Sequence, residues 1–231
     1  MTTPVRLVFS DVDETLIRCK SMFDFLDFYL GRTHGRDGTA RARAVRERLA
    51  ALAAAGTPRE QANRVYYRAW AGEPADRVTA AGAEWFARRA AAGSFYVPAT
   101  RDALLGHLAD GAALVLVSGS FPAVVDPLAA AIGATHVVCS RPGARDGVLT
   151  GELVGEPVIG EAKRSAVRRL LAAHPHIDPA DCHAYGDHVS DLPMLTEVGH
   201  PVVVGGRELA RRLPGGVFLP ADDGVTSPVG D

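Results

Sequence analysis

The chain has 231 residues, of which 47% are hydrophobic, and a formal net charge of -2 at pH 7. This composition is sufficient for a substantial buried core and excludes a disordered chain. A charge so close to zero gives no general attraction to nucleic acid or to an anionic membrane. The arginines between residues 32 and 48 are therefore interpreted as a solvated helix face rather than a nucleic-acid patch.

Three further features concern location. No apolar run approaches the length that spans a bilayer, and the N-terminus lacks the basic-then-apolar order of a signal peptide. The cysteines Cys19, Cys139 and Cys182 have no paired spacing, so neither a disulfide framework nor a zinc site is indicated. We therefore expect a cytoplasmic protein without a membrane partner.

Short apolar runs alternate with helical patterns along most of the chain. Continuous apolar runs are typical of strands in a parallel sheet that is covered on both faces. Such runs occupy 7–9, 114–117 and 202–204, with a weaker candidate at 183–185. Helical patterns between them include 122–132 and 163–174. The alternation predicts an α/β fold with a doubly wound, Rossmann-like parallel sheet, whose ligands bind beyond the carboxyl ends of the strands.

Residues 18–94 break this alternation. They contain four segments of helical character and no clear strand, namely 21–30, 40–55, 59–70 and 77–92. Such a block, placed directly after the first strand, predicts an inserted all-helical cap, with a discontinuous core made of 1–17 and 95–231. A set of aromatic residues is spaced like packed helix faces and is expected to form the core of the cap: Tyr66, Tyr67, Trp70, Trp85 and Phe86. The polar residues 222–231 are expected to fray.

The first chemical motif is Asp11-Val12-Asp13-Glu14-Thr15, which comes directly after the first apolar run. A buried strand that ends in two carboxylates is costly unless those charges bind a metal or take part in chemistry. Side chains two residues apart on a strand share one face, so Asp11 and Asp13 can converge on one point. One carboxylate could then attack a phosphorus atom while the other handles the proton.

Three further motifs follow in chain order. Ser118-Gly119-Ser120 follows the second apolar run, where a hydroxyl and a backbone N–H can hold a phosphate oxygen. Lys163 lies in the first turn of a predicted helix and can offset the charge of a phosphoryl group. Asp187 and Asp191, four residues apart at a strand-to-helix turn, can complete an oxygen-rich magnesium site. Each motif alone is weak evidence, but the order acid, hydroxyl, lysine, acid is hard to obtain by chance.

This ordered set resembles the haloacid dehalogenase superfamily and, within it, the phosphoserine-phosphatase-like branch, whose helical cap follows the first motif. The resemblance extends to the segment from Thr150-Gly151-Glu152 to Gly160-Glu161-Ala162-Lys163. It implies a Mg²⁺-dependent phosphatase that hydrolyses a small phosphorylated metabolite, a phosphate monoester, through an aspartyl-phosphate.

The resemblance also implies a role for each motif. Asp11 would be the nucleophile, and Asp13 would protonate the leaving alcohol and then deprotonate the attacking water. Ser118 with Gly119, together with Lys163, would bind the phosphoryl oxygens. The residues implied for Mg²⁺ are Asp11, Asp13 through its main-chain carbonyl, Asp187, and Asp191, which would hold a metal-bound water or Lys163.

The sequence departs from the pattern of this branch at three positions. Lys20 stands where phosphoserine phosphatases have a glutamate that pairs with the substrate's amino group. A cation there would repel an ammonium, so the substrate is expected to be anionic and not L-phosphoserine, unless Lys20 points to water. Glu14 replaces a small residue, often glycine. His188 replaces a smaller residue, and it either contacts the substrate or is a partly exposed loop histidine.

Two alternatives stay open at this point. A phosphotransferase or phosphomutase would use the same aspartyl-phosphate and would keep water out. A non-catalytic binding module would have a degenerate site, against which the presence of all the motif residues counts. The sequence does not identify the metabolite or the oligomeric state.

Overall fold

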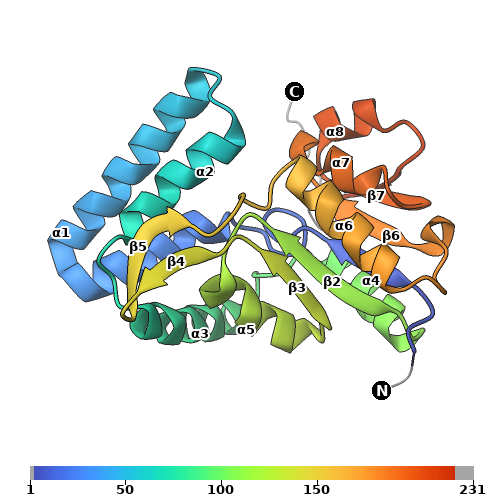
Figure 1. Ribbon diagram of the computed structural model, residues 1–231, viewed down its shortest axis with the longest axis horizontal. Coiled ribbons are helices and arrows are strands. Elements are labelled where there is room, and N and C mark those ends of the chain that lie inside the picture. The colour runs from blue at the N-terminus through green and yellow to red at the C-terminus, as the bar shows by residue number, and fades with distance from the viewer. Residues whose placement is uncertain (1–2, 222–231) are drawn as a thin grey trace, which may run out of the picture.

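The computed structural model describes residues 3–221; residues 222–231, for which the sequence predicts fraying, lie outside this range. Its centre is a six-stranded parallel sheet with the strand order β3-β2-β1-β6-β7-β8 (Figure 1). A two-stranded hairpin, β4–β5, lies apart from this sheet. The strands are β1 (Leu7–Ser10), β2 (Ala113–Ser118), β3 (His136–Cys139), β4 (Pro142–Arg145), β5 (Val148–Leu153), β6 (His183–Gly186), β7 (His200–Val204) and β8 (Val217–Leu219).

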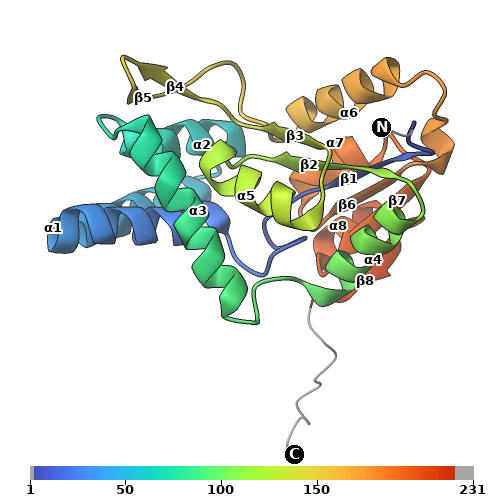
Figure 2. The same cartoon turned by 90° about the horizontal axis from the view of Figure 1, so that it is seen from below.

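Helices cover both faces of the sheet, as Figure 2 shows for α6 on one side and for α4 and α5 on the other. The α-helices are α1 (Ser21–Ala54), α2 (Arg59–Tyr67), α3 (Ala75–Ala91), α4 (Pro98–Ala109), α5 (Pro122–Ile132), α6 (Glu161–Ala173), α7 (Leu192–Leu195) and α8 (Arg207–Arg212). Three short 3₁₀ turns are η1 (Arg68–Trp70), η2 (Pro179–Asp181) and η3 (Val189–Asp191). Every helix within residues 3–221 is too short or too polar to cross a lipid bilayer.

The apolar runs form strands because alternate side chains enter two separate cores. Val8 and Leu116 belong to the core under α4 and α5, whereas Phe9 and Val115 belong to the core under α6 and α7. The chain order reverses at β1, because β2 and β3 lie on one side of it and β6, β7 and β8 on the other. The predicted doubly wound α/β sheet is therefore confirmed, and its crevice lies at the carboxyl end of β1.

Three structural features were not predicted from the sequence. The strands β3 and β8 lie at the two edges of the sheet and are only partly buried, and their apolar runs are only two or three residues long. The hairpin turn at Asp146-Gly147 has positive φ at both residues, 51° and 77°. This is the signature of a type I′ turn, and the Asp-Gly pair is its usual sequence signal.

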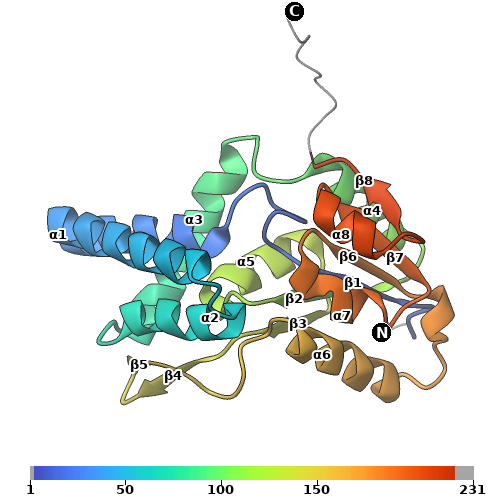
Figure 3. The ribbon, with the colours of Figure 1, turned by 90° about the horizontal axis from the view of Figure 1, so that it is seen from above.

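Helix α1 doubles back on itself at Gly35, where φ is 59° and ψ is -132°. A side chain on Gly38 would lie 1.9 Å from the carbonyl oxygen of Leu30, and Arg46 forms an ion pair with Asp27. Residues after Gly35 thus contact residues before it in reverse order along the chain. α1 therefore consists of two antiparallel helical segments. They correspond to the two separate helices that the sequence predicts at 21–30 and 40–55. Figure 3 shows α1 projecting beyond the end of the sheet.

The aromatic residues of the cap pack around the ring of Phe121, which belongs to the sheet domain. Tyr66, Tyr67, Trp70 and Trp85 are buried, as predicted for the aromatic core, whereas Phe86 is only partly buried and packs against this cluster. Phe121, directly before α5, lies 5.2 Å from Trp70 and 5.7 Å from Tyr67 between ring centroids. The cap and the sheet domain therefore share one hydrophobic cluster.

The hairpin β4–β5 joins the cap through backbone hydrogen bonds. The N–H of Gly72 donates to the carbonyl of Leu149, and the N–H of Leu149 donates to the carbonyl of Glu73, both at 2.9 Å. The hairpin, which the sequence analysis assigned to the core, thus extends the edge of the cap. The division of the chain at residues 18 and 94 stays a prediction.

Gly82 on α3 lies against α5, and its replacement by alanine is expected to destabilise the fold. An added Cβ would lie 1.8 Å from the carbonyl oxygen of Ala123, so the two helices would have to separate, at a cost of about 1–3 kcal/mol. Gly106 on α4 is the matched control, because a Cβ there meets nothing within 4 Å. Gly106→Ala should stabilise by about 0.5–1 kcal/mol. Urea unfolding measures both, and equal midpoints would contradict the packing described.

Three histidines at the amino-terminal edge of the sheet should make the fold sensitive to acid. The ring of His183 lies 4.3 Å from that of His107 and 4.5 Å from that of His200. Burial, followed by repulsion from His107, lowers the pKa of His183 to about 4. The neutral form is therefore favoured in the fold. The contribution of neutral His183 to the free energy of unfolding is complete above a pH of about 6.5, the pKa of histidine in an unfolded chain. This contribution is lost as the pH falls towards about 4, the pKa in the fold.

The variant His183→Phe tests this dependence. Phenylalanine keeps the ring and removes the buried Nδ1 atom, which has no hydrogen-bond partner among residues 3–221. Between pH 7 and pH 4.5, the free energy of unfolding should fall less in the variant than in the wild type. Parallel pH profiles for the two proteins would show that His183 does not carry the effect.

Candidate active site

Residues from all four predicted motifs line one cavity at the carboxyl edge of the sheet. Asp11 and Asp13 follow β1, Ser118 ends β2, Asp187 follows β6, and Lys163 projects from the first turn of α6. The cavity has a volume of about 660 Å³. Parallel strands bring these residues together because their carboxyl ends lie at the same edge. Lys20, Gly119 and His188 line the same cavity.

Lys163 links two carboxylates. Its Nζ atom lies 2.7 Å from Oδ1 of Asp11 and 2.7 Å from Oδ1 of Asp191, and the side chain is only 3% exposed. Although burial lowers the pKa of Lys163, the two carboxylates raise it above its usual value. The ammonium is therefore charged at neutral pH and fixed beside Asp11.

Asp191 is buried behind the cavity, and both of its oxygens are engaged. Oδ1 accepts from Lys163, while Oδ2 accepts the backbone N–H groups of Asp187 at 3.2 Å and of His188 at 3.1 Å. A side chain at Gly186 would collide with Asp191, because an added Cβ would lie 2.6 Å from the Cβ of Asp191. Asp191 thus orients Lys163 and the backbone that carries Asp187.

Asp11, Asp187 and Asp191 bring carboxylate oxygens within 4.8 Å of one another. Burial and then the charges of Asp11 and Asp191 raise the pKa of Asp187 to about 8. Burial also raises the pKa of Asp11 to about 6, against the opposing effect of Lys163. Three carboxylates face one ammonium, so the cluster carries excess negative charge on oxygen donors alone. This donor set fits a hard divalent cation.

Asp13 differs from the neighbouring carboxylates because one of its oxygen atoms has no hydrogen-bond partner among the described residues. Its Oδ1 atom is buried and accepts no hydrogen bond from the described residues. Burial and the charge of Asp11 raise the pKa of Asp13 to about 7, although hydrogen bonds from Ser21 lower it. A carboxyl group with this pKa can give up and take back a proton near neutral pH.

The loop after β2 is held by residues that the sequence analysis missed. The carbonyl of Gly119 accepts from Nδ2 of Asn63 at 3.2 Å and from the hydroxyl of Tyr67 at 3.0 Å. Both donors come from α2, so the cap fixes the loop that carries Ser118. Thr15 belongs to the first motif, but the sequence predicts no role for it; its hydroxyl donates to Oδ1 of Asp187 at 3.0 Å. Asn63 and Tyr67 belong to none of the four motifs.

Lys20 and Glu14 face each other at the rim of the cavity. The Nζ atom of Lys20 lies 3.3 Å from Oε2 of Glu14, and both side chains are about half exposed. Glu14 has a φ of 58°, in the left-handed region that favours glycine. The positive φ explains why the resembled family usually has a small residue, often glycine, at this position. The ion pair with Glu14 partly neutralises the charge of Lys20.

His188 lines the cavity and also caps the turn that follows it. Its Nδ1 atom accepts the backbone N–H of Ser190 at 3.0 Å. Burial, followed by the positive charge of Arg59, lowers the pKa of His188, so the ring is neutral at pH 7. A contact between His188 and a substrate stays a prediction.

The chain matches the haloacid dehalogenase-like hydrolases over residues 8–196. It is 42% identical over 104 residues to a protein of Mycobacterium tuberculosis named a probable phosphatase, which covers 45% of this chain and 35% of that protein. It is 38% identical over 107 residues to the inhibition of morphological differentiation protein of Streptomyces azureus, which covers 46% of this chain and 38% of that protein. These matches span only about a third of the length of the curated relatives.

Solved structures match over nearly the whole chain. A protein of unknown function from Bordetella pertussis is 30% identical with a TM-score of 0.80, covering 96% of this chain and 100% of that one. A phosphoserine phosphatase, solved as a phospho-aspartyl intermediate analogue, has a TM-score of 0.67 at 18% identity, covering 95% of this chain and 94% of that one. The second likeness shows the fold alone.

Proposed function

Because this chain belongs to the haloacid dehalogenase-like hydrolase family, we propose that it hydrolyses a small phosphate monoester with Mg²⁺ through an aspartyl-phosphate on Asp11. Phosphatases of this family use a divalent metal. The observation that best supports the proposal is the arrangement around Lys163, whose ammonium lies 2.7 Å from both Asp11 and Asp191. A nucleophile that faces a fixed cation suits phosphoryl transfer, in which charge stabilisation dominates catalysis.

In the first step, a carboxylate oxygen of Asp11 bonds to phosphorus as the bond to the ester oxygen breaks. Asp13 gives its proton to the leaving oxygen, which the raised pKa of Asp13 favours. In the second step, Asp13 takes a proton from a water molecule whose oxygen bonds to phosphorus, and the bond to Asp11 breaks. Phosphate leaves, and both carboxyl groups return to their starting states.

Three groups stabilise the phosphoryl oxygens in this scheme. Lys163 and the hydroxyl of Ser118 bind them, and the N–H of Gly119 adds a backbone donor. Mg²⁺, held by Asp11, Asp187 and the main-chain carbonyl of Asp13, would supply further positive charge. Asp191 is a positioning residue, because its two oxygens hold Lys163 and the backbone of residues 187 and 188.

We propose that the substrate carries a second anionic group and is not L-phosphoserine. Lys20 would repel an ammonium, but its charge is shared with Glu14. Arg59 lines the same cavity, and its guanidinium bonds to the hydroxyl of Ser190 at 3.4 Å without an acidic partner among residues 3–221. The anionic group would therefore bind Arg59, assisted by Lys20.

The variant Lys20→Glu tests the charge at the rim. It should place two carboxylates side by side, because Glu14 lies within ion-pair distance. The KM for a phosphate ester that also carries a carboxylate should rise by about tenfold or more, and turnover of a neutral-alcohol ester should change less. Unchanged KM values for both esters would remove Lys20 from substrate selection.

The proposed function itself is tested by phosphate release across a panel of phosphomonoesters, with Mg²⁺ and with a chelator. The panel should include esters with a carboxylate, with a second phosphate and with an amine, L-phosphoserine among them. We expect release that depends on Mg²⁺ and needs no acceptor other than water. Release only in the presence of a second alcohol would identify a phosphotransferase, and activity that survives the chelator would contradict the metal-dependent mechanism.

A further inference from the structure

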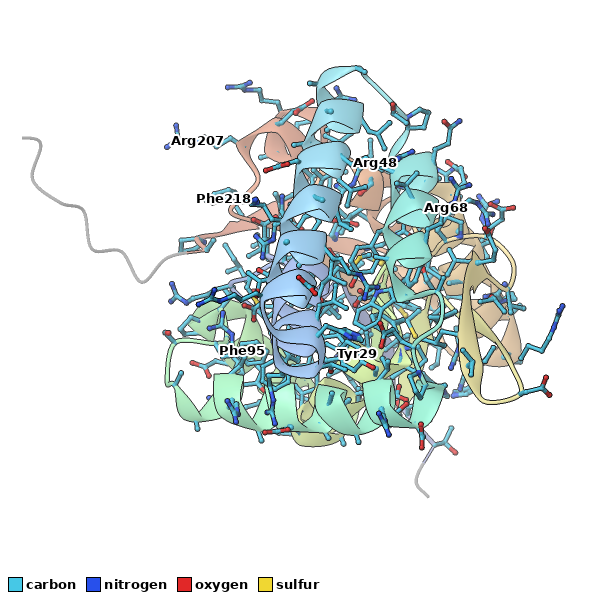
Figure 4. The ribbon with its side chains drawn as sticks, turned by 90° about the vertical axis from the view of Figure 1, so that its left-hand side faces the viewer. Tyr29, Arg48, Arg68, Phe95, Arg207 and Phe218 are labelled. Carbon is cyan, nitrogen blue, oxygen red and sulfur yellow. The ribbon has the colours of Figure 1, made fainter. Side chains whose placement is uncertain are left out.

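One wall of the cavity is apolar and lies beyond the catalytic carboxylates. It is built by the two segments of α1, by α2 and by the segment before α6. Figure 4 shows α1 and α2 side by side. The apolar side chains that line this part of the cavity are Met22, Phe23, Leu49, Ala53, Ala62 and Ile159.

The two helices present regular faces to the cavity. On α1, the lining residues Arg46, Leu49, Ala50 and Ala53 recur at the spacing of one helix face. Leu49 on this face is buried in the hydrophobic core, whereas Ala50 and Ala53 are exposed. Small side chains on this face leave room between α1 and α2 instead of filling it.

The face of α2 shows the same spacing. Arg59, Ala62, Asn63 and Tyr66 line the cavity, and the hydroxyl of Tyr66 donates to the carbonyl of Met22 at 2.8 Å. Asn63 also donates to Gly119 in the loop beside Ser118. These bonds fix α2 to the first segment of α1 and to the loop beside Ser118, so this side of the cavity is already assembled.

The size of the cavity exceeds what a small alcohol needs. Pockets of roughly 300–1,000 Å³ hold ligands of drug size, and this cavity of about 660 Å³ falls within that range. A phosphate group and a short alcohol would fill only its polar end, between Asp11 and Ser118. The apolar wall would then stay in contact with water.

We infer that the substrate is a phosphate monoester of an alcohol with an extended apolar body, which lies along the wall formed by α1 and α2. This inference rests on the proposed phosphatase function and adds the chemical class of the leaving group. The observation that supports it is that the catalytic carboxylates and the apolar side chains line the same cavity. The anionic group of the substrate lies at the mouth beside Arg59, and the apolar body lies against Leu49, Ala53 and Ala62.

A series of ethyl, butyl, hexyl and octyl phosphate, used below the concentrations at which micelles form, tests the inference. For the wild-type protein with Mg²⁺, kcat/KM should rise with chain length by up to about fourfold for each methylene that is buried. A value that stays flat from ethyl to octyl phosphate overturns the inference and leaves the proposed function intact. Failure to release phosphate from any ester, both in this series and in the panel of phosphomonoesters described above, overturns the proposed function.

Two neighbouring variants locate the effect. Ala53→Glu places a charge on the apolar wall and should lower the octyl-to-ethyl ratio of kcat/KM by about tenfold or more. Ala54→Glu is the matched control, because Ala54 is exposed on the same helix and does not line the cavity; its ratio should equal that of the wild type. The same loss of ratio in both variants would overturn the assignment of the wall.

A binding measurement separates the two proposals. The variant Asp11→Asn, which lacks the proposed nucleophile, is titrated with ethyl and octyl phosphate in a calorimeter. Tighter binding of octyl phosphate supports the apolar site even if no ester is turned over. Equal affinities for the two esters overturn it.

Discussion

Replacing Asp11 with asparagine is expected to abolish phosphate release, with a loss of kcat of about 10⁴-fold or more, the scale seen when a covalent nucleophile is removed. An amide oxygen is a poor nucleophile, so the aspartyl-phosphate would not form. Phosphate release from the best ester of the panel measures the effect. A kcat within tenfold of the wild type would show that Asp11 is not the nucleophile.

The stability of Asp11→Asn provides the control for this result. Burial raises the pKa of Asp11 to about 6, above its unfolded value, so the charged carboxylate destabilises the fold at pH 8. Asparagine removes that charge and keeps an oxygen that can accept from Lys163. The free energy of unfolding at pH 8, measured in a chelator, should therefore not fall. An unfolded variant would make the loss of activity uninformative, and far-UV circular dichroism detects that case.

The second large effect is expected for Lys163→Met. Methionine has a similar length but carries no charge, so Asp11 and Asp191 would be left buried without their shared cation. Breaking a buried pair in this way costs about 3–5 kcal/mol. Activity should fall by about 10²-fold or more, because a charge that stabilises the transferring phosphoryl group is lost.

A double variant separates the two roles of Lys163. Adding Asp191→Asn removes one of the two stranded charges, and should restore part of the stability in urea unfolding without restoring activity. Full recovery of activity in the double variant would show that Lys163 acts only by neutralising Asp191. No recovery of stability would contradict the buried ion pair as the cause of the loss.

Much of the candidate site could be predicted from the sequence, because the carboxyl ends of parallel strands constrain where their side chains lie. Asp11, Ser118 and Asp187 each lie at or directly after the end of a buried strand, and such ends meet at one edge. Lys163 was placed by its position in the first turn of a helix. Chain order and strand polarity predict that Asp11, Ser118 and Asp187 meet, and the family resemblance adds Lys163 to them.

Other parts of the site depend on contacts that no local pattern encodes. Glu14 faces Lys20 because the backbone of Glu14 adopts a positive φ, and nothing in the residue type indicates this. Phe121 packs among aromatic rings of the cap, which lie far away in the sequence. These contacts follow from the packing of the cap against the sheet, and only the structure reveals them.

Helices α1, α2 and α3 occupy the region where the sequence predicts a helical cap, and the hairpin β4–β5 pairs with that region. The backbone of Leu149 pairs with that of Gly72 and Glu73, so part of the chain beyond residue 95 extends the cap. The alternating burial along β5 is typical of a strand with one covered face, but the surface that covers it cannot be inferred from that pattern. The hairpin thus pairs with the segment between η1 and α3.

The most direct test of the central claim is to trap the phosphoryl group on the protein. The wild-type enzyme is mixed with an ester in the presence of Mg²⁺ and quenched in acid, and its peptides are mapped by mass spectrometry. We predict a phosphoryl adduct on Asp11, present in the wild type and absent from Asp11→Asn. Rapid phosphate release with no adduct at any quench time, or an adduct on another residue, would contradict the account.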